Sequence, residues 1–274
     1  MSKDIKLVVL DIDGTIAGED NQVSAKLQDT IKAVQDRGVK VGIATGRMYR
    51  SAVRFHHTVG ADVPLISYQG ALIKDPNTEQ VVNHLPVAKD YALSLLDNLQ
   101  DYDDLIVHLY VDDQLYVDTI LPQTEVYADR SQVPVVPVGC LQTFVQTQEP
   151  PTKILAMSDN TDRIGQLLVD FKQRYRPDQL YLTRSQARYF EATNPQANKG
   201  NAVKFLAENL YGLQAEEVMT IGDNANDIEM VKYAGIGVAM GNGAEELKLC
   251  ADWIAPPIEA DGAAVALEKF ILSR

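Results

Sequence analysis

Two carboxylates, two positions apart, follow the first apolar run of the chain. Residues 7–10 are continuously apolar, as expected of a strand buried on both faces of a sheet, and Asp11-Ile12-Asp13-Gly14-Thr15 comes directly after them. Side chains alternate along an extended segment, so Asp11 and Asp13 are predicted to point the same way. Carboxylates held that close repel unless a proton or a cation separates them. For this motif alone, an acidic turn that caps a helix is the alternative.

A second acidic cluster follows another apolar run, residues 218–221. It reads Gly222-Asp223-Asn224-Ala225-Asn226-Asp227 and offers four more oxygen-bearing side chains. Carboxylates and carbonyls are the ligands that Mg²⁺ prefers. One such loop could be a solvated turn, but two acidic loops at strand ends favour a site, because open α/β sheets bind ligands at the carboxyl ends of their strands.

Two segments could supply groups that bind a phosphate. Thr45-Gly46-Arg47 follows the apolar run 39–44, and its hydroxyl and backbone amides lie at the predicted start of a helix, where anions bind well. Lys199 lies at the start of another predicted helix and carries a compact positive charge. Neither signal is specific alone, since Thr45 could cap a helix and most lysines are exposed.

Composition excludes some classes of function. The chain has 274 residues, 46% of them hydrophobic, and a net charge of −13, which argues against binding to nucleic acid or to an anionic membrane. The same charge repels a phosphoester, so a metal ion or a placed lysine must reverse the field locally. No apolar run is long enough to span a membrane, and no signal peptide is recognisable. With two cysteines and no C-x-x-C pair, a cytoplasmic protein with reduced thiols is expected.

The order of predicted elements indicates an α/β fold in two parts. Strand and helix patterns alternate at both ends of the chain, which predicts a Rossmann-like, doubly wound parallel sheet. Between them the strands are shorter and half-polar, with a hairpin signal at Asp112-Asp113. We therefore predict a core domain from residues 1–86 and 187–274, with an α+β cap domain, residues 87–186, inserted between them.

The two acidic segments, the segment around Thr45 and the one around Lys199 are the candidate site segments. In their order along the chain they resemble the four motifs of the haloacid dehalogenase superfamily of phosphohydrolases, in particular its Cof-like branch with a type IIB cap. The resemblance covers nearly the whole chain, and the combination is highly specific. It rests on the segments Asp11-Ile12-Asp13-Gly14-Thr15, Ala44-Thr45-Gly46-Arg47, Lys199 and Gly222-Asp223-Asn224-Ala225-Asn226-Asp227, and on Gly235 to Asn242.

The resemblance implies a Mg²⁺-dependent phosphatase. Asp11 would be the nucleophile that forms an aspartyl-phosphate, and Asp13 the general acid and then the base. The implied metal ligands are Asp11, Asp13 through its carbonyl, Asp223 and Asp227, the last holding waters or orienting its neighbours. The groups assigned to the phosphate or the substrate are Thr45, Gly46, Arg47, Lys199 and Asn226.

Substrate and partners are less specified. The resemblance implies a small phosphorylated metabolite, sugar phosphates first and flavin or pyridoxal phosphates next, and a monomer or weak homodimer. Gln69-Gly70-Ala71 departs from the Asn-Gly-Ala of the branch, and residues 256–262 lack its usual asparagine loop, which leaves substrate recognition open. The alternatives are a sugar phosphomutase on the same core and a non-catalytic regulatory member. A phospho-accepting receiver domain needs no inserted cap.

Overall fold

The computed structural model describes residues 4–273, and these divide into two units. The first comprises the described residues through Arg47, then Ala52–Val82, and those from Asn198 onward. The second comprises Met48–Ser51 and Asn83–Ala197. Each unit has its own sheet and its own apolar core. No helix within residues 4–273 has the length and apolar character needed to cross a membrane.

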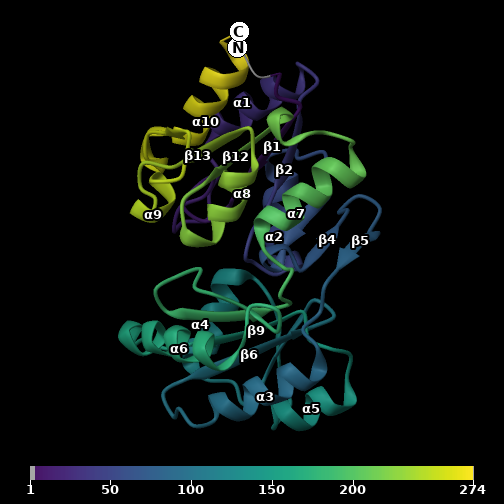
Figure 1. Ribbon diagram of the computed structural model, residues 1–274, viewed down its shortest axis with the longest axis vertical. Coiled ribbons are helices and arrows are strands. Elements are labelled where there is room, and N and C mark those ends of the chain that lie inside the picture. Colours follow the sequence, from purple (N-terminus) through teal and green to yellow (C-terminus); the bar gives the residue numbers. More distant parts are fainter. Residues whose placement is uncertain (1–3, 274) are drawn as a thin grey trace. The chain divides into compact units, whose positions relative to one another are not determined.

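A five-stranded parallel sheet forms the centre of the first unit (Figure 1). Its order is β14-β13-β12-β1-β2, and β1 is paired with β12 on one side and β2 on the other. The residues of β1 are fully buried, as the continuous apolar run predicts. The strands are β1 (Leu7–Leu10), β2 (Lys40–Ile43), β12 (Val218–Gly222), β13 (Ile236–Ala239) and β14 (Trp253–Ile254).

The connections of this sheet run in two directions from β1. The chain passes from β1 through α1 to β2, and from β12 through α8 to β13 on the other side. Right-handed crossovers in opposite directions place helices on opposite faces, and α1 contacts α10 whereas α8 contacts α7 (Figure 1). The expected doubly wound fold is confirmed. The helices are α1 (Ala25–Gln35), α2 (Tyr49–Thr58, of this unit from Ala52), α7 (Lys199–Lys204) with η2 (Phe205–Leu210), α8 (Ile228–Tyr233), α9 (Glu245–Lys248) and α10 (Gly262–Leu267) with η6 (Glu268–Leu272).

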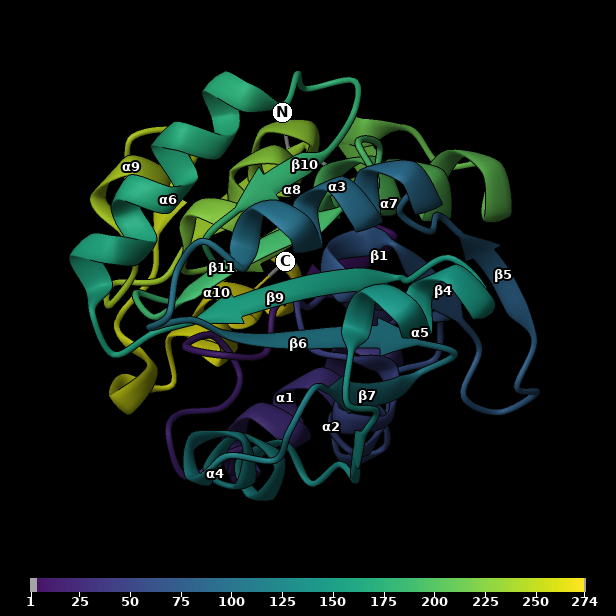
Figure 2. The same ribbon diagram turned by 90° about the horizontal axis from the view of Figure 1, so that it is seen from below.

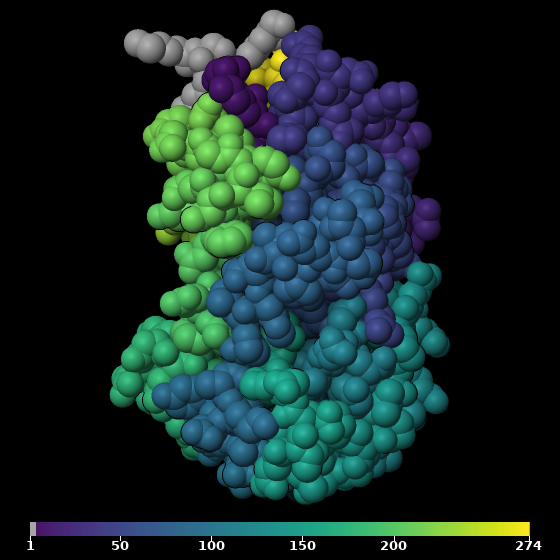
Figure 3. Space-filling model, turned by 90° about the vertical axis from the view of Figure 1, so that its right-hand side faces the viewer, coloured from purple at the N-terminus to yellow at the C-terminus, as the bar shows by residue number. Residues whose placement is uncertain are grey.

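A small sheet lies beside β2. It has the order β3-β4-β5, with β3 (Leu65–Ser67), β4 (Leu72–Lys74) and β5 (Val81–His84). A parallel bridge between Ala44 and Ile66 joins it to the end of β2. Apolar residues of this sheet share one core cluster with α7 and η2, and in Figure 3 its blue surface lies against the green segment that follows Asn198. The small sheet is therefore placed against two of the segments that carry predicted site residues.

The second unit is a six-stranded, mostly antiparallel sheet of order β10-β11-β9-β6-β7-β8. Helices α3, α5 and α6 cover one face (Figure 2), where they share an apolar core with alternate residues of β6, β9 and β11. Its elements are α3 (Lys89–Leu99), β6 (Ile106–Val111), β7 (Gln114–Val117), α4 (Pro122–Ser131), β8 (Val135–Pro137), α5 (Leu141–Thr147), β9 (Lys153–Met157), α6 (Thr161–Arg174), β10 (Tyr181–Thr183) and β11 (Tyr189–Thr193).

The insertion ends later than the sequence predicts. Residues 187–197 were expected in the core, but β11 pairs antiparallel with β9 and β10 and so belongs to the second unit. The pattern of one strand does not reveal which sheet it joins, because that depends on its partners. The hairpin at Asp112-Asp113 is confirmed, with φ of 49° and 53° at its two central residues. Helix α3 was not foreseen.

Candidate active site

Three of the predicted site segments meet at one edge of the first sheet. Strands β12, β1 and β2 are neighbours and parallel, so Asp223, Asp11 and Thr45 follow strand ends on the same side. The pairing continues past the ends of the strands, since the Asp11 amide donates to the Ile221 carbonyl over 3.0 Å and the Ala44 amide to the Leu10 carbonyl over 2.9 Å. The backbone that carries these side chains is thus held in register by the sheet.

Lys199 lies buried between two carboxylates. Its Nζ is 2.7 Å from Asp11 Oδ1 and 2.5 Å from Asp227 Oδ1, and its side chain is 0% exposed. Helix α7 presents it from its first position, after Asn198, whose side chain accepts a hydrogen bond from the Asn201 amide and caps the helix. The alternative of a solvated surface lysine is therefore wrong.

Asp227 organises the second acidic loop. Its Oδ2 accepts hydrogen bonds from the amides of Asp223 (2.9 Å) and Asn224 (3.0 Å), while Oδ1 faces Lys199. A Cβ at Gly222 would lie 2.5 Å from the Asp227 carboxyl carbon, so glycine is required there. Both oxygens of Asp227 are engaged by the protein, which suits a residue that orients its neighbours.

The acidic side chains fit a divalent cation. Asp11, Asp223 and Asp227 each offer a carboxylate oxygen, and these oxygens lie within 4.8 Å of one another. Asp223 Oδ1 is buried without a hydrogen-bond partner, which is costly unless another ligand satisfies it. Gly14, with φ of +80°, leaves the space that the Asp223 carboxylate fills. All-oxygen donors of this kind suit Mg²⁺.

Burial and mutual repulsion shift the ionisation of these groups. Burial raises the pKa of Asp11 to about 7, Lys199 opposes the rise, and the charges of Asp227 and Asp13 add to it. Burial also raises the pKa of Asp223 to about 9, and the nearby carboxylates of Asp11 and Asp227 add to that shift. Burial lowers the pKa of Lys199, but Asp11 and Asp227 together raise it above its ordinary value. The protein alone does not balance the negative charge here, and a cation would.

Asp13 and Arg47 pair with each other. Arg47 Nε donates to Asp13 Oδ2 over 2.9 Å, and Nη2 donates to Asp13 Oδ1 and to Asn21 Oδ1, each over 2.6 Å. The guanidinium also lies 4.7 Å from the centre of the Phe55 ring. From the sequence we assigned Arg47 to the substrate. In this structure its guanidinium instead binds the carboxylate of Asp13, the residue predicted to be the general acid.

Thr45, Gly46 and Asn226 are buried or partly buried beside this array. Thr45 is 1% exposed, and its Oγ1 accepts a hydrogen bond from the Arg47 amide over 3.2 Å. Both residues lie ahead of α2, which begins at Tyr49, so Thr45 does not cap that helix. Asn226 Nδ2 donates to Gln69 Oε1 over 3.0 Å, and its Oδ1 is buried without a partner. Sequence reasoning noted Gln69 only as a departure from a family pattern and missed this contact.

Asn242 ties the first acidic loop to a distant segment. Its Nδ2 donates to the Gly14 carbonyl over 2.8 Å, and its Oδ1 accepts from the Ile258 amide over 2.9 Å. The sequence match at Gly235 to Asn242 thus includes a residue that supports the loop after Asp13.

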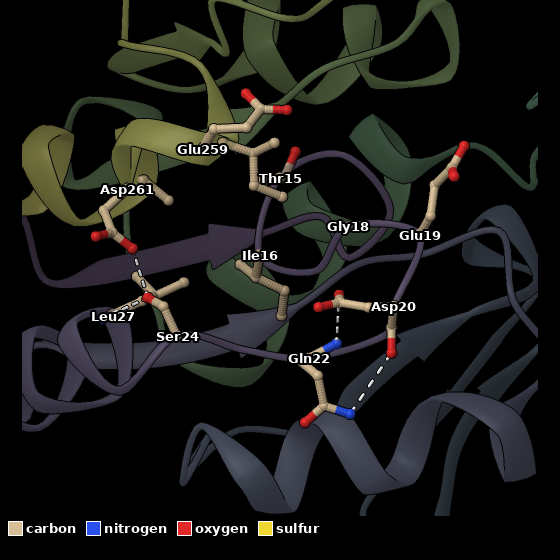
Figure 4. A pocket seen from close by; sticks show the side chains of 12 residues that line it. Thr15, Ile16, Gly18, Glu19, Asp20, Gln22, Ser24, Leu27, Glu259 and Asp261 are labelled. Carbon is tan, nitrogen blue, oxygen red and sulfur yellow. Dashed lines mark hydrogen bonds between the residues drawn. The ribbon is translucent and has the colours of Figure 1, made fainter.

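A cavity of about 310 Å³ lies beyond that loop, lined by Thr15 and by the segments around Ser24 and Glu259 (Figure 4). Two of its lining residues are hydrogen-bonded to each other, since Ser24 Oγ donates to Asp261 Oδ1 over 2.5 Å (Figure 4). Glu19, Asp20, Glu259 and Asp261 line it as well. Four carboxylates make this cavity unfavourable for a phosphate, which is better placed near Lys199.

Comparisons with known proteins agree with this geometry. YxeH of Bacillus subtilis, classed by name as a phosphatase, is 29% identical over 277 residues, which cover 98% of this chain and 99% of the relative. The 5-amino-6-(5-phospho-D-ribitylamino)uracil phosphatase YitU of the same organism is 27% identical, with 96% of this chain and 97% of the relative covered. The solved structure of a haloacid dehalogenase-like hydrolase from B. subtilis superposes with a TM-score of 0.85 at 25% identity, covering 96% of this chain and 99% of the other.

The family match extends over nearly the whole chain. The model of a family described as haloacid dehalogenase-like hydrolase matches residues 8–267, so it spans both units of the structure. The Cof-like resemblance and the expected class of enzyme, a hydrolase, are thereby confirmed. Two acidic loops at neighbouring strand ends, a lysine buried between them and this match together show that the chain belongs to the haloacid dehalogenase-like hydrolase family.

Proposed function

We propose that this hydrolase is a Mg²⁺-dependent phosphatase that cleaves small phosphomonoesters through an aspartyl-phosphate on Asp11. One observation carries the proposal: Asp11 is buried, held 2.7 Å from the ammonium of Lys199, and grouped with Asp223 and Asp227. A carboxylate fixed beside cations can meet an anionic phosphoryl group without repelling it.

The side chains divide the two chemical steps between them. A carboxylate oxygen of Asp11 attacks phosphorus, the bond from phosphorus to the ester oxygen breaks, and Asp13 gives its proton to the departing oxygen. Water then attacks the aspartyl-phosphate, Asp13 takes a proton from that water, and inorganic phosphate leaves Asp11. The Thr45 hydroxyl and the Gly46 amide would bind the transferring oxygens, while the Arg47 amide donates to Thr45 Oγ1 and orients that hydroxyl.

Asp11, Asp223 and the Asp13 carbonyl would hold Mg²⁺, with Asp227 orienting the loop. When bound, the ion supplies positive charge that neutralises the phosphoryl oxygens. Lys199 adds a second cation whose charge is secured by its two carboxylate neighbours. These two positive charges would offset the repulsion between a phosphate ester and a protein of net charge −13, because they act at short range in a buried site.

We place the substrate among sugar phosphates, with flavin and pyridoxal phosphates as the next classes. YitU, a relative at 27% identity, is named for a substrate that carries a phosphate on a ribityl chain. The partner is then a small phosphorylated metabolite. A cytoplasmic location and a monomer or weak homodimer belong to the same proposal.

A phosphate-release screen over these classes tests the function. Asp11→Asn is the blank, because the amide keeps the shape of the side chain but is a poor nucleophile. The wild type should release inorganic phosphate in Mg²⁺, and folded Asp11→Asn should not. Normal turnover by Asp11→Asn would end the assignment of the nucleophile. An isomerised sugar phosphate would identify a phosphomutase, and no release from any monoester would identify a regulatory member.

A further inference from the structure

The buried turn η1 (Tyr68–Gly70) has an unusual backbone. Tyr68 and Gln69 have φ of 52° and 60°, and Gly70 has φ of 98°. Two successive residues with side chains in the left-handed region cost free energy, and such conformations persist where surrounding contacts impose them. Tyr68 and Gln69 are 0% and 1% exposed, so the contacts that impose this backbone conformation come from the protein and not from solvent.

Backbone hydrogen bonds hold this turn against the Thr45–Arg47 loop. The Tyr68 amide donates to the Arg47 carbonyl over 2.8 Å, and the Gln69 amide donates to the Thr45 carbonyl over 3.0 Å. The backbone of the turn is therefore joined to the backbone of the loop at two points. These two hydrogen bonds stabilise the left-handed conformation of Tyr68 and Gln69.

The same turn packs against the start of the helix that carries Lys199. A Cβ at Gly70 would lie 2.6 Å from the Asn198 carbonyl oxygen and 3.0 Å from the Ala202 side chain. Helix α7 contacts η1 along this side. Gly70 is thus required both by its φ and by the close approach of Asn198, the residue that caps the helix before Lys199.

The Gln69 side chain reaches the third segment. Its Oε1 accepts a hydrogen bond from Asn226 Nδ2 over 3.0 Å, across a sequence separation of 157 residues. Its amide also fills the space beside Gly46, where any Cβ would collide with Gln69 Nε2. Gly46 therefore has a packing reason to be glycine, in addition to any contact of its amide with phosphate.

From these contacts we infer that Gln69 is a positioning residue, which sets the spacing between the Thr45–Arg47 loop and the Asn226–Asp227 turn. The inference rests on the proposed function, since these are the segments assigned to phosphate and metal. A bound phosphoryl group must meet groups from both segments at once. A displacement of about 1 Å between such groups can cost about 100-fold in rate.

The test uses p-nitrophenyl phosphate with saturating Mg²⁺. Gln69→Met removes the amide at similar length, and Gln69→Ala covers the case in which the longer variant does not fold. Either variant should lower kcat/KM by about 10- to 100-fold, mainly through kcat. Gln35→Met is the matched control, because Gln35 donates to the Gly60 carbonyl away from the site and should leave kcat unchanged.

A double-mutant cycle with Asn226→Ala separates positioning from folding. If the two side chains act through one hydrogen bond, the double variant should be no more than about threefold worse than the worse single variant, because additivity fails for residues in contact. A role in folding alone would instead lower Tm while the folded protein kept its normal kcat. Unchanged kcat in folded Gln69 variants, or fully additive losses, would overturn this inference alone. A wild type without turnover would overturn both this inference and the phosphatase proposal.

Discussion

Arg47 donates hydrogen bonds to both carboxylate oxygens of Asp13, with Nε 2.9 Å from Oδ2 and Nη2 2.6 Å from Oδ1. A planar guanidinium in this paired geometry fixes the plane of the carboxylate as well as its position. The Arg47 side chain is only 12% exposed, and Asn21 accepts a further bond from it. Arg47 is therefore placed to aim the predicted acid rather than to hold substrate in this state.

Replacing Arg47 should impair the proton-transfer step. Arg47→Ala is expected to lower kcat/KM by about 10- to 100-fold, and Arg47→Lys nearly as much, because lysine cannot form the paired contact. The loss should be larger for an alkyl phosphate than for p-nitrophenyl phosphate, since a poor leaving group depends more on a proton donor. Steady-state kinetics on both esters measures this difference.

A matched control is Arg176→Ala, which removes an exposed arginine paired with Asp178 in the second unit. It should leave both rates within about twofold of wild type. An equal loss on the two esters for Arg47→Ala would show that Arg47 acts on the phosphate and not through Asp13.

Removing the buried ammonium should affect both rate and stability. Lys199→Met keeps the length of the side chain but leaves Asp11 and Asp227 without their shared cation. We expect a loss of about 100- to 1,000-fold in kcat and a lower Tm in EDTA. Adding Mg²⁺ should recover part of the Tm, because the ion replaces some of the missing charge.

Lys204→Met is the control on the same helix, since Lys204 is exposed at the end of α7. Its kinetics and Tm should match wild type. Lys199→Met with full activity would remove the lysine from the mechanism.

Metal removal should abolish turnover reversibly. EDTA is expected to stop phosphate release and Mg²⁺ to restore it, and the apparent affinity for Mg²⁺ should fall at least about tenfold in Asp223→Asn, which loses a charged ligand. Titration of activity against free Mg²⁺ gives both values. Asp20→Asn changes an acidic residue of the neighbouring cavity and should not alter this affinity. A rate independent of metal would contradict the role of Asp223.

His108 predicts a pH dependence of stability. It is fully buried in the second unit, 3.3 Å from the Thr124 hydroxyl, and burial together with the charge of Lys153 lowers its pKa to about 3. At pH values below about 6.5, the ordinary pKa of histidine, His108 is protonated in the unfolded chain but stays neutral in the folded chain. The stability that neutral His108 contributes is therefore complete above about pH 6.5 and is lost as the pH falls toward 3.

Urea unfolding at pH 7 and pH 5, followed by circular dichroism, tests this effect. The free energy of unfolding of the wild type should fall by about 2 kcal/mol more than that of His108→Gln over this interval. His57→Gln, which changes an exposed histidine of α2, should follow the wild type. Parallel curves for wild type and His108→Gln would mean that His108 takes up a proton in the folded state.

Much of the core fold could be predicted from local pattern. A continuous apolar run followed by Asp11, Thr45 or Asp223 indicates a doubly covered strand that ends in a polar loop, and each of these strands is present. The end of the insertion could not be predicted in this way. The local pattern of residues 189–193 would predict a strand whichever unit the segment joined. Only its pairing with β9 and β10 assigns it to the second unit.

The sequence by itself determined which residue types could do phosphoryl chemistry and in which order they occur. Only the tertiary structure decided their partners: Lys199 meets Asp11 across 188 residues, Gln69 meets Asn226 across 157, and Arg47 turns to Asp13. The reason is physical. Local patterns encode the strands and helix starts, which depend on neighbours along the chain. Contacts between loops depend on how β1, β12, α7 and the small sheet pack together, and no short stretch of residues contains that information.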